Sequence, residues 1–489
     1  MPETIVNLEN VSYRYPREKN WALRDINLSI AEGEFLAVMG EDGAGKTTFC
    51  KLFNGIIPHH LGGQFLGNVI VDGENTREGH ASSLAVKSGI VLDDPDAQLF
   101  TTSVRDETAF GPENLLLPAD EILKRVEYAL SAAGLAGFQK RAPSTLSGGE
   151  KQRLSIACAL AMMGKVLVLD EPLSRLDPRG KEDFMSVLKE VRRKYQLTVI
   201  MAAHESKMIA GSADRVCVLK DGRIADCDTP EKIFANSALL ENAIQPPNDA
   251  DIYAVFTVKN EPSEKDPAVC IKDFCYSYSD DGACIENINL SIADNDFTAV
   301  IGNNGCGKTT LLKSIAGLLR PCSGDIFIRG KNTKRLTVSD ISKEAGFVMQ
   351  NPDTQLFTDS VFNEVSFALK NSGLAKAEIQ LRVEEALNIV GLKEADAFPL
   401  ALNRADRVKT VFASVLAMGS KIIILDEIDS GQDYRGSRNI MNIARELHSR
   451  GFTIIFVTHN MSLACEYAHR LIIMERNGIV SDKVSDRAK

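Results

Sequence analysis

Short apolar runs that end in a glycine or an acid recur along this chain. One run covers residues 35–39 and leads into a glycine-rich octet, and another covers 166–169 and ends at Asp170-Glu171. Continuous apolar runs of four or five residues are typical of strands that are buried on both faces of a parallel sheet. Because helical stretches separate these runs, the pattern predicts an α/β fold in which helices flank a mainly parallel sheet.

The same series of runs returns in the second half of the chain. The run 297–301 also leads into a glycine-rich octet, and the run 422–425 also ends in Asp-Glu. A further pair of runs, 199–203 and 454–458, leads in each half to a histidine. The sequence therefore predicts two copies of one domain, each with an added helical part.

We place the first domain at residues 1–244 and the second at 268–489. The stretch 245–267 between them contains four prolines together with acids and asparagines, which is typical of a linker.

Composition narrows the class of protein. The chain has 489 residues, of which 44% are hydrophobic and 25% charged, as in soluble globular proteins. A formal net charge of −10 argues against nucleic acid as a partner. The ten cysteines form no CxxC pair, which favours reduced thiols in a cytosol. Neither a signal peptide nor a membrane-spanning apolar run is evident, so we expect a chain that does not itself cross a membrane.

The two octets, 40–47 and 302–309, are P-loops. In this motif the glycines let backbone N–H groups wrap the phosphates of a nucleotide, the lysine reaches the β- and γ-oxygens, and the threonine hydroxyl binds Mg²⁺. The predicted nucleotide-binding residues are Gly40, Gly43, Gly45, Lys46, Thr47 and Thr48 in the first half, and Gly302, Gly305, Gly307, Lys308, Thr309 and Thr310 in the second.

The Asp-Glu pairs complete a candidate catalytic site. Asp170 and Asp426 are predicted to hold Mg²⁺ with Thr47 and Thr309. The following acids, Glu171 and Glu427, stand where a carboxylate can orient an attacking water. The alternative for each pair is a solvated strand end, and for His204 and His459 it is a histidine satisfied at a strand end. We predict catalytic roles for all four of these glutamate and histidine residues.

Tyr15 and Tyr278 occupy matching places in the two halves and are candidates for stacking on adenine. Tyr13 and Tyr276 share their strand faces, so packing in the core is the alternative for these tyrosines.

A helix predicted to open at Ser147-Gly148-Gly149 could present its first backbone N–H groups to a phosphate. The run 146–153 resembles the signature motif of ABC ATPases. Taken with the P-loops, Asp-Glu pairs and histidines in this order, it makes nearly the whole chain resemble a tandem ABC ATPase. The resemblance implies ATP and Mg²⁺ as cofactors, with Gln350 as a glutamine that contacts the metal and the attacking water.

The segments 94–100 and 350–357, followed by 110–114, look like those of the ATPases of energy-coupling factor (ECF) importers. The resemblance implies two membrane partners, a transmembrane scaffold (T-type) protein and a substrate-capturing (S-type) subunit, with a vitamin, nickel or cobalt as cargo. It places the chain peripherally on the cytoplasmic face of the membrane. The apolar pairs Leu99-Phe100 and Leu356-Phe357 stand in a region otherwise rich in Asp, Asn, Pro and Thr, and they are candidates for docking the scaffold, with core packing as the alternative. Their neighbours Asp96 and Asp353 are expected to attract basic residues of that partner.

In ABC ATPases the domains pair head to tail, which implies intramolecular pairing of the two halves. The second P-loop would then meet Ser147, Gly148 and Gly149, whereas the first would meet Asn403, Arg404 and Ala405. The first half also carries Asp93 where the family has the glutamine. The sequence therefore predicts one competent and one degenerate ATP site.

Two other interpretations stay open. The fused ATPase of a sugar importer has about this length, although the Pro-Asp-x-Gln-Leu-Phe runs argue against it. An ABC-F-type ribosomal ATPase is a further alternative, against which stand the short linker and the acidic charge. A separate hypothesis concerns Cys306 inside the second P-loop, where Lys308 and the loop N–H groups are expected to favour a reactive thiolate.

Overall fold

The computed structural model describes residues 3–174, 176–242, 244, 255–258, 267–278, 284–430, 432–475 and 478–485. The chain divides near residue 248 into two compact units, and each is described here by itself. The linker predicted at 245–267 lies outside the described residues, except for 255–258 and 267. Of these, Phe256–Val258 forms a strand, β11, in the sheet of the second unit.

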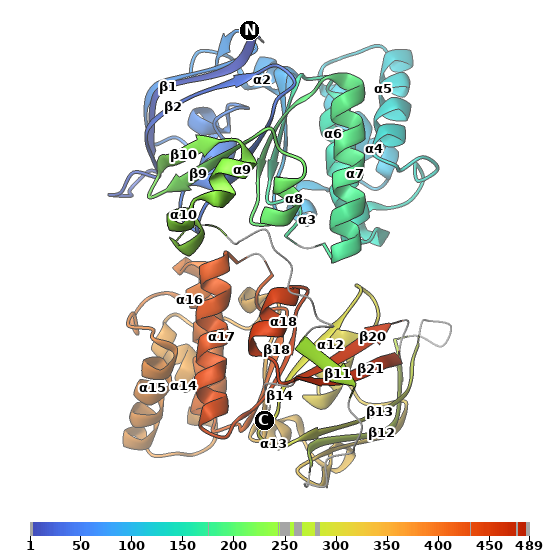
Figure 1. Ribbon diagram of the computed structural model, residues 1–489, viewed down its shortest axis with the longest axis vertical. Coiled ribbons are helices and arrows are strands. Elements are labelled where there is room, and N and C mark those ends of the chain that lie inside the picture. The colour runs from blue at the N-terminus through green and yellow to red at the C-terminus, as the bar shows by residue number, and fades with distance from the viewer. Residues whose placement is uncertain are drawn as a thin grey trace. The chain divides into compact units, whose positions relative to one another are not determined.

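A six-stranded sheet organises the first unit (Figure 1). Its order is β10-β9-β3-β8-β7-β6, and every neighbouring pair is parallel except β10 with β9. The strands are β3 (Phe35–Met39), β6 (Ser88–Val91), β7 (Val166–Asp170), β8 (Thr198–Ala202), β9 (Arg215–Lys220) and β10 (Arg223–Asp228). Strands β3, β7 and β8 are buried along their whole length, as the apolar runs predict.

A second, antiparallel sheet of four strands, in the order β2-β1-β4-β5, covers the P-loop side of the core. Its strands are β1 (Thr4–Arg14), β2 (Leu23–Ala31), β4 (Gln64–Val71) and β5 (Glu74–Asn75). The burial of β2 alternates along the strand, because only one face meets the core. The sequence predicted a single, mainly parallel sheet and did not separate this one.

The second unit repeats this arrangement. Its mainly parallel sheet has seven strands, in the order β11-β21-β20-β14-β19-β18-β17, and its antiparallel sheet has the order β13-β12-β15-β16. The strands are β12 (Pro267–Ser277), β13 (Cys284–Ala293), β14 (Phe297–Gly302), β15 (Ser323–Ile328), β16 (Lys331–Asn332), β17 (Ala345–Val348), β18 (Ile422–Asp426), β19 (Thr453–Val457), β20 (Arg470–Glu475) and β21 (Gly478–Ser485).

Helices flank both parallel sheets, and three of them in each unit form the predicted helical part (Figure 1). The first unit has α1 (Lys46–Cys50), α2 (Ala81–Lys87), α3 (Pro95–Gln98), α4 (Val104–Asn114), α5 (Ala119–Ala132), α6 (Gly148–Ala161), α7 (Pro178–Tyr195), α8 (Ser206–Ala210), α9 (Pro230–Ala235) and α10 (Ser237–Asn242). The second has α12 (Lys308–Ile315), α13 (Val338–Ser342), α14 (Val361–Asn371), α15 (Lys376–Val390), α16 (Arg404–Ala417), α17 (Tyr434–Ser449) and α18 (Met461–Tyr467). Helices α4, α5 and α6 in the first unit, and α14, α15 and α16 in the second, pack against one another and form the helical part. The predicted α/β class and its duplication are confirmed. Within the described part of the chain, every helix is too short or too polar to cross a lipid bilayer.

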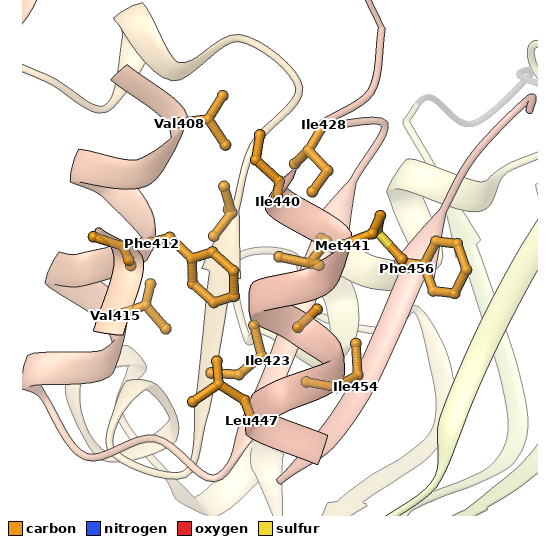
Figure 2. Close-up of a cluster of buried hydrophobic side chains, with 14 of the residues drawn as sticks. Val408, Phe412, Val415, Ile423, Ile428, Ile440, Met441, Leu447, Ile454 and Phe456 are labelled. Atoms are coloured by element: carbon orange, nitrogen blue, oxygen red, sulfur yellow. The ribbon is translucent and has the colours of Figure 1, made fainter. Parts of the chain in front are cut away.

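Figure 2 shows how the helical part is joined to the sheet in the second unit. Phe412 and Val415 of α16 point toward Leu447 of α17 and Ile423 of the parallel sheet. All of these side chains belong to one buried apolar cluster. The position of the N-terminus of α16 therefore depends on apolar packing well below it.

We expect Phe412→Ala to destabilise the second unit, because the ring is fully buried and its loss leaves a cavity. Such truncations cost about 3–5 kcal/mol, which should lower the melting temperature of this unit in calorimetry by several degrees. Phe398→Ala is the matched control, since that ring is 51% exposed. Equal shifts for the two variants would contradict the packing described here.

Candidate functional site

The two P-loops follow directly from β3 and β14 and lead into α1 and α12. Gly45 and Gly307 precede these helices with left-handed backbones, at φ 103° and 99°. A Cβ atom at Gly40 would lie 2.3 Å from the carbonyl oxygen of Leu219, and one at Gly302 would lie 2.2 Å from that of Met474. Glycine is therefore required at these turns, because a side chain there would strike the backbone of the neighbouring strand.

The P-loop lysines lie under their loops. Lys46 Nζ donates to the carbonyl oxygens of Gly40 (3.0 Å) and Glu41 (3.2 Å), and Lys308 Nζ donates to those of Gly302 (2.8 Å) and Asn303 (3.1 Å). Both side chains are buried, so each ammonium has exchanged water for carbonyl oxygens. Phosphate oxygens are stronger partners for such a charge than neutral carbonyls.

Each predicted metal pair is brought together. Thr47 Oγ1 lies 3.2 Å from Asp170 Oδ1, and Thr309 Oγ1 lies 3.1 Å from Asp426 Oδ1. Burial, and then the neighbouring glutamate, raises the pKa of each aspartate to about 6. Among the described residues, the buried Oδ2 of Asp170 has no hydrogen-bond partner. A hydroxyl beside an acid with an unused oxygen is a donor set that fits a hard divalent cation.

In the second unit the predicted catalytic residues form one cluster around Glu427. Gln350 Nε2 donates to Glu427 Oε2 at 2.8 Å, and His459 Nε2 lies 2.9 Å from Glu427 Oε1. Lys308 Nζ is 3.8 Å away. Glu427 has a left-handed backbone, at φ 46°, which is costly for a residue with a Cβ and is typical of active sites. Gln350 thus contacts the carboxylate of Glu427. The contact with the metal that the sequence also predicts for Gln350 stays a prediction.

In the first unit Glu171 again lies near a histidine and the P-loop lysine, and the histidine also contacts a second acid, Asp42. His204 Nε2 is 3.0 Å from Glu171 Oε1 and 3.3 Å from Asp42 Oδ1, and Lys46 Nζ is 3.5 Å from Glu171. Although burial lowers it, the pKa of His204 is raised to about 10 by the Glu171 and Asp42 carboxylates. The sequence analysis missed Asp42. Its signal was the second acid of the loop Gly40-Glu41-Asp42, where the other loop has Asn304.

The signature run opens α6 as predicted. Ser147 Oγ accepts from Glu150 N at 3.3 Å, and Ser147 N donates to Glu150 Oε2 at 2.7 Å, which together make a capping box. A Cβ at Gly148 would meet no described atom within 4 Å, and one at Gly149 would make only an ordinary contact with Leu176. The packing of the first unit therefore does not itself require glycine at these two positions.

The corresponding run of the second unit also begins a helix, α16, but its first residues carry side chains where the first unit has glycines. Asn403 Oδ1 caps α16 by accepting from Asp406 N at 2.9 Å. Arg404 follows where the first unit has Gly148, and its guanidinium donates to the carbonyl oxygen of Gln350 at 3.3 Å. An arginine and Ala405 thus occupy the positions at which the other unit offers bare backbone.

The paired tyrosines lie just past the ends of β1 and β12. Tyr15 Oη is 3.0 Å from Thr48 Oγ1, and Tyr278 Oη is 3.2 Å from Thr310 Oγ1. Tyr13 is fully buried, whereas Tyr278 is 69% exposed. Core packing is therefore wrong as an explanation for Tyr278, and stacking on adenine stays a prediction for it and for the half-buried Tyr15.

The hypothesis of a reactive thiolate at Cys306 is wrong. The side chain is 4% exposed, and burial raises the pKa of the thiol despite the nearby Lys308 ammonium. The residue packs into the apolar cluster between the two sheets of its unit, so it is better described as a small core residue.

Comparisons with known proteins match both halves of the chain. The family model described as "ABC transporter" matches residues 23–174 and 285–430. An ABC transporter ATP-binding protein of Caldanaerobacter subterraneus subsp. tengcongensis is 36% identical, over 96% of this chain and 89% of that protein. One from Methanosarcina acetivorans is 35% identical, over 98% and 85%. Among solved structures, cbiO1 of Clostridium perfringens, described as part of the ABC transporter complex cbiONQ, is 35% identical, covers 49% of this chain and 94% of its own, and has a TM-score of 0.44.

The raised pKa of Asp426 predicts a gain in stability from neutralising it. A pKa raised from 3.8 to about 6 favours the protonated acid, so stability is lost as the pH rises through this range. At pH 7.5 we expect Asp426→Asn to stabilise the nucleotide-free protein by about 1–3 kcal/mol. At pH 4 the gain should vanish, because Asp426 is then neutral. Calorimetry at both pH values checks this, and a gain that does not depend on pH would contradict it.

Proposed function

The chain belongs to the ABC transporter family, whose ATP-binding proteins are ATPases, and from this membership we propose that it is the ATPase of an ECF-type importer. The observation that carries the proposal is a pair of phenylalanines displayed in the same way in both units. Phe100 packs edge-on against Phe110 at 4.9 Å, and Phe357 packs against Phe367 at 4.8 Å, both at 90°. Phe100 and Phe357 are 66% and 64% exposed, so packing in the core does not explain them.

The backbone that carries each phenylalanine is held by a buried acid. Glu107 Oε2 accepts from the N–H groups of Phe100 (3.0 Å) and Thr101 (2.7 Å). Glu364 Oε2 does the same for Phe357 (3.0 Å) and Thr358 (2.8 Å). An apolar ring that is fixed in water by the fold is typical of a docking surface.

In the second unit this ring borders a groove of about 270 Å³. Exposed apolar side chains line it, among them Leu318, Val338, Phe357 and Phe367. We propose that a short helix of a T-type transmembrane scaffold docks here with its apolar face, as helices dock in grooves of this kind. An S-type subunit on the same scaffold would capture the cargo, a vitamin or a transition-metal ion, and the chain would lie on the cytoplasmic face of the membrane.

The acids beside the phenylalanines do not support the role expected for them. Asp96 Oδ1 lies 2.6 Å from Lys151 Nζ, and both carboxylate oxygens of Asp353 lie 2.9 Å from Arg407 Nη1. Each acid is therefore neutralised within its own unit, by a base near the start of α6 or α16. Apolar contact, not charge, is the more direct basis for docking.

We propose that each P-loop binds ATP with Mg²⁺. Lys46 and Lys308 would leave the loop carbonyls for the phosphates, while Thr47 with Asp170 and Thr309 with Asp426 would hold the cation. When bound, Mg²⁺ would neutralise charge that develops on the phosphate oxygens. Glu427 would orient the attacking water as a general base, with its carboxylate positioned by Gln350 and His459. Glu171 and His204 would take the corresponding places in the first unit.

We further propose that turnover is unequal, because ABC ATPases pair head to tail and only one signature is intact. Ser147, Gly148 and Gly149 would complete the site of the second P-loop, which has the glutamine, glutamate and histidine together. Arg404 and Ala405 would face the first P-loop, whose unit has Asp93 in place of the glutamine. The first site would bind nucleotide and hydrolyse it slowly. Of the alternatives, the two Pro-Asp-x-Gln-Leu-Phe runs argue against a sugar importer, and a ribosomal role offers no use for the exposed phenylalanines.

Docking can be tested by changing Phe100 and Phe357 together to Ser. Because both rings are mostly exposed, the double variant should fold and bind ATP, yet lose the transmembrane partner during affinity purification from solubilised membranes. Phe398→Ser is the control, as an exposed phenylalanine outside the groove. Retention of the membrane partner by the folded double variant would refute the docking site. Recovery of ribosomal proteins with the parent chain would refute the importer itself.

The inequality of the two sites can be tested with the matched pair Glu427→Gln and Glu171→Gln. Losing a positioned general base costs about 10²- to 10⁴-fold in rate. We therefore expect Glu427→Gln nearly to abolish steady-state ATP hydrolysis and Glu171→Gln to leave a substantial fraction. Similar losses in the two variants would show that both sites turn over, with ATP binding measured alongside to confirm that each variant is folded.

A further inference from the structure

Two cysteines of the first unit face each other across the hairpin β9–β10. Cys217 and Cys227 are direct partners in the register of this antiparallel pair. Both pack against the same apolar cluster between the two sheets, so their side chains share a face. Directly opposed residues in such a pair have Cα atoms about 4.5–5.5 Å apart, which lies within the range that a disulfide spans. Cys217 is fully buried, whereas Cys227, on edge strand β10, is partly exposed.

A guanidinium group lies beside the more accessible thiol. Arg215 Nη2 donates to Cys227 Sγ at 3.1 Å, while its Nη1 donates to the carbonyl oxygen of Ser29 at 3.1 Å and lies 3.1 Å from Glu34 Oε1. A cation fixed next to a sulfur atom stabilises the thiolate, which is the nucleophilic form of cysteine.

The second unit has a carboxylate at the position that corresponds to Cys227. There Arg470 donates to the carbonyl oxygen of Ser291 at 2.6 Å and lies 3.4 Å from Asp296, as Arg215 does with Ser29 and Glu34. Its remaining nitrogen atoms bind Asp482 at 2.8 and 2.7 Å. Asp482 pairs with Ile472 across β20–β21, as Cys227 pairs with Cys217 across β10–β9. In the first unit a sulfur atom therefore stands where the second has a carboxylate.

The groups around the pair shift the pKa values of the two thiols in opposite directions. A hydrogen bond from Cys217, and then the Arg215 guanidinium, holds the pKa of Cys227 below its usual range against burial and the Glu34 carboxylate. The same hydrogen bond, and then burial, raises the pKa of Cys217. One sulfur is thus prepared to attack and the other stays protonated beside it.

We propose that Cys227 and Cys217 form a redox-active dithiol, in which a peroxide oxidises Cys227 and Cys217 closes a reversible disulfide. The Cys227 thiolate attacks one oxygen of hydrogen peroxide, and the O–O bond breaks. This gives a sulfenic acid and, after protonation, one water. Cys217 then attacks the sulfenic sulfur, the S–O bond breaks, and the hydroxyl leaves with the proton of Cys217 as a second water. Two thiols and one peroxide thus give one disulfide and two waters.

This site has a short route to the first P-loop. The turn of the same hairpin places Gly222 N 3.2 Å from the carbonyl oxygen of Ala44, inside that loop. The carbonyl oxygen of Leu219 in β9 is the atom that a Cβ at Gly40 would meet. A disulfide between β10 and β9 would therefore constrain the hairpin whose turn borders the phosphate site.

The test uses the full-length chain and hydrogen peroxide in slight excess, with peptide mass spectrometry of the products. We expect a Cys217–Cys227 disulfide that dithiothreitol removes. Cys227→Ser should abolish it, and Cys217→Ser should leave a sulfenic acid at Cys227 that dimedone traps. Cys227→Asp, which copies the ion pair of the second unit, is the folding control and should melt no lower than the parent.

Cys322 is the matched thiol, because it is exposed and its hydrogen bond in the described structure is to the carbonyl oxygen of Ser277, not from a guanidinium. At pH 7 Cys227 should react with iodoacetamide at least as fast as Cys322, although Cys227 is the more buried of the two thiols. Oxidation of Cys322 before Cys227, or failure of the disulfide to form in the folded parent, would overturn the dithiol.

The link between the dithiol and the first P-loop is tested in a Lys308→Ala background, in which the second P-loop lacks its lysine. Unchanged ATP affinity after complete oxidation of this variant would overturn the link.

Discussion

Parallel pairing of three buried strands is the constraint on which each nucleotide site depends. In the first unit β3 pairs with β8, and β8 pairs with β7, so that Val38 and Asp170 both lie beside Ala202. Parallel strands end at the same edge of their sheet, so the P-loop, the Asp-Glu pair and the histidine must emerge together. The second unit repeats this register with Val300, Val457 and Asp426. Apolar packing along these strands therefore fixes a polar site at their ends.

At that edge of the sheet, the glutamate that follows each aspartate has a strained backbone, which fixes the position of its carboxylate. Glu171 and Glu427 have left-handed backbones at φ 50° and 46°, and each donates its N–H across the sheet, to Ala202 and Val457 respectively. This conformation costs about 1–3 kcal/mol for a residue with a side chain. It turns the carboxylate out of the sheet plane toward the P-loop lysine. Burial raises the pKa values of Asp170 and Asp426, and the charge of the neighbouring glutamate raises them further, to about 6.

The sequence was sufficient for features that short-range patterns determine, namely the strands, the P-loops and the acids at the strand ends. It was insufficient where contacts depend on the tertiary fold. The antiparallel sheets went unrecognised because their alternating strands are half-buried and carry a weaker pattern than the continuous runs. Asp96 and Asp353 looked available to a partner, because nothing in the spacing shows that Lys151 and Arg407 come back to them. Cys306 looked reactive, because its motif says nothing about burial between two sheets.

The two units differ in their chemistry at positions that the fold of each unit does not enforce. Gly40 and Gly302 cannot carry a Cβ without striking backbone of their own unit, and both are glycine. A Cβ at Gly148 meets no described atom of its unit, and the second half has Arg404 at that place without losing the helix, since Asn403 still caps α16. The same holds for Cys227 and Asp482, because either group can face the arginine. A duplicated fold keeps what its own packing requires, so the positions that packing leaves free are where the two halves can acquire different functions.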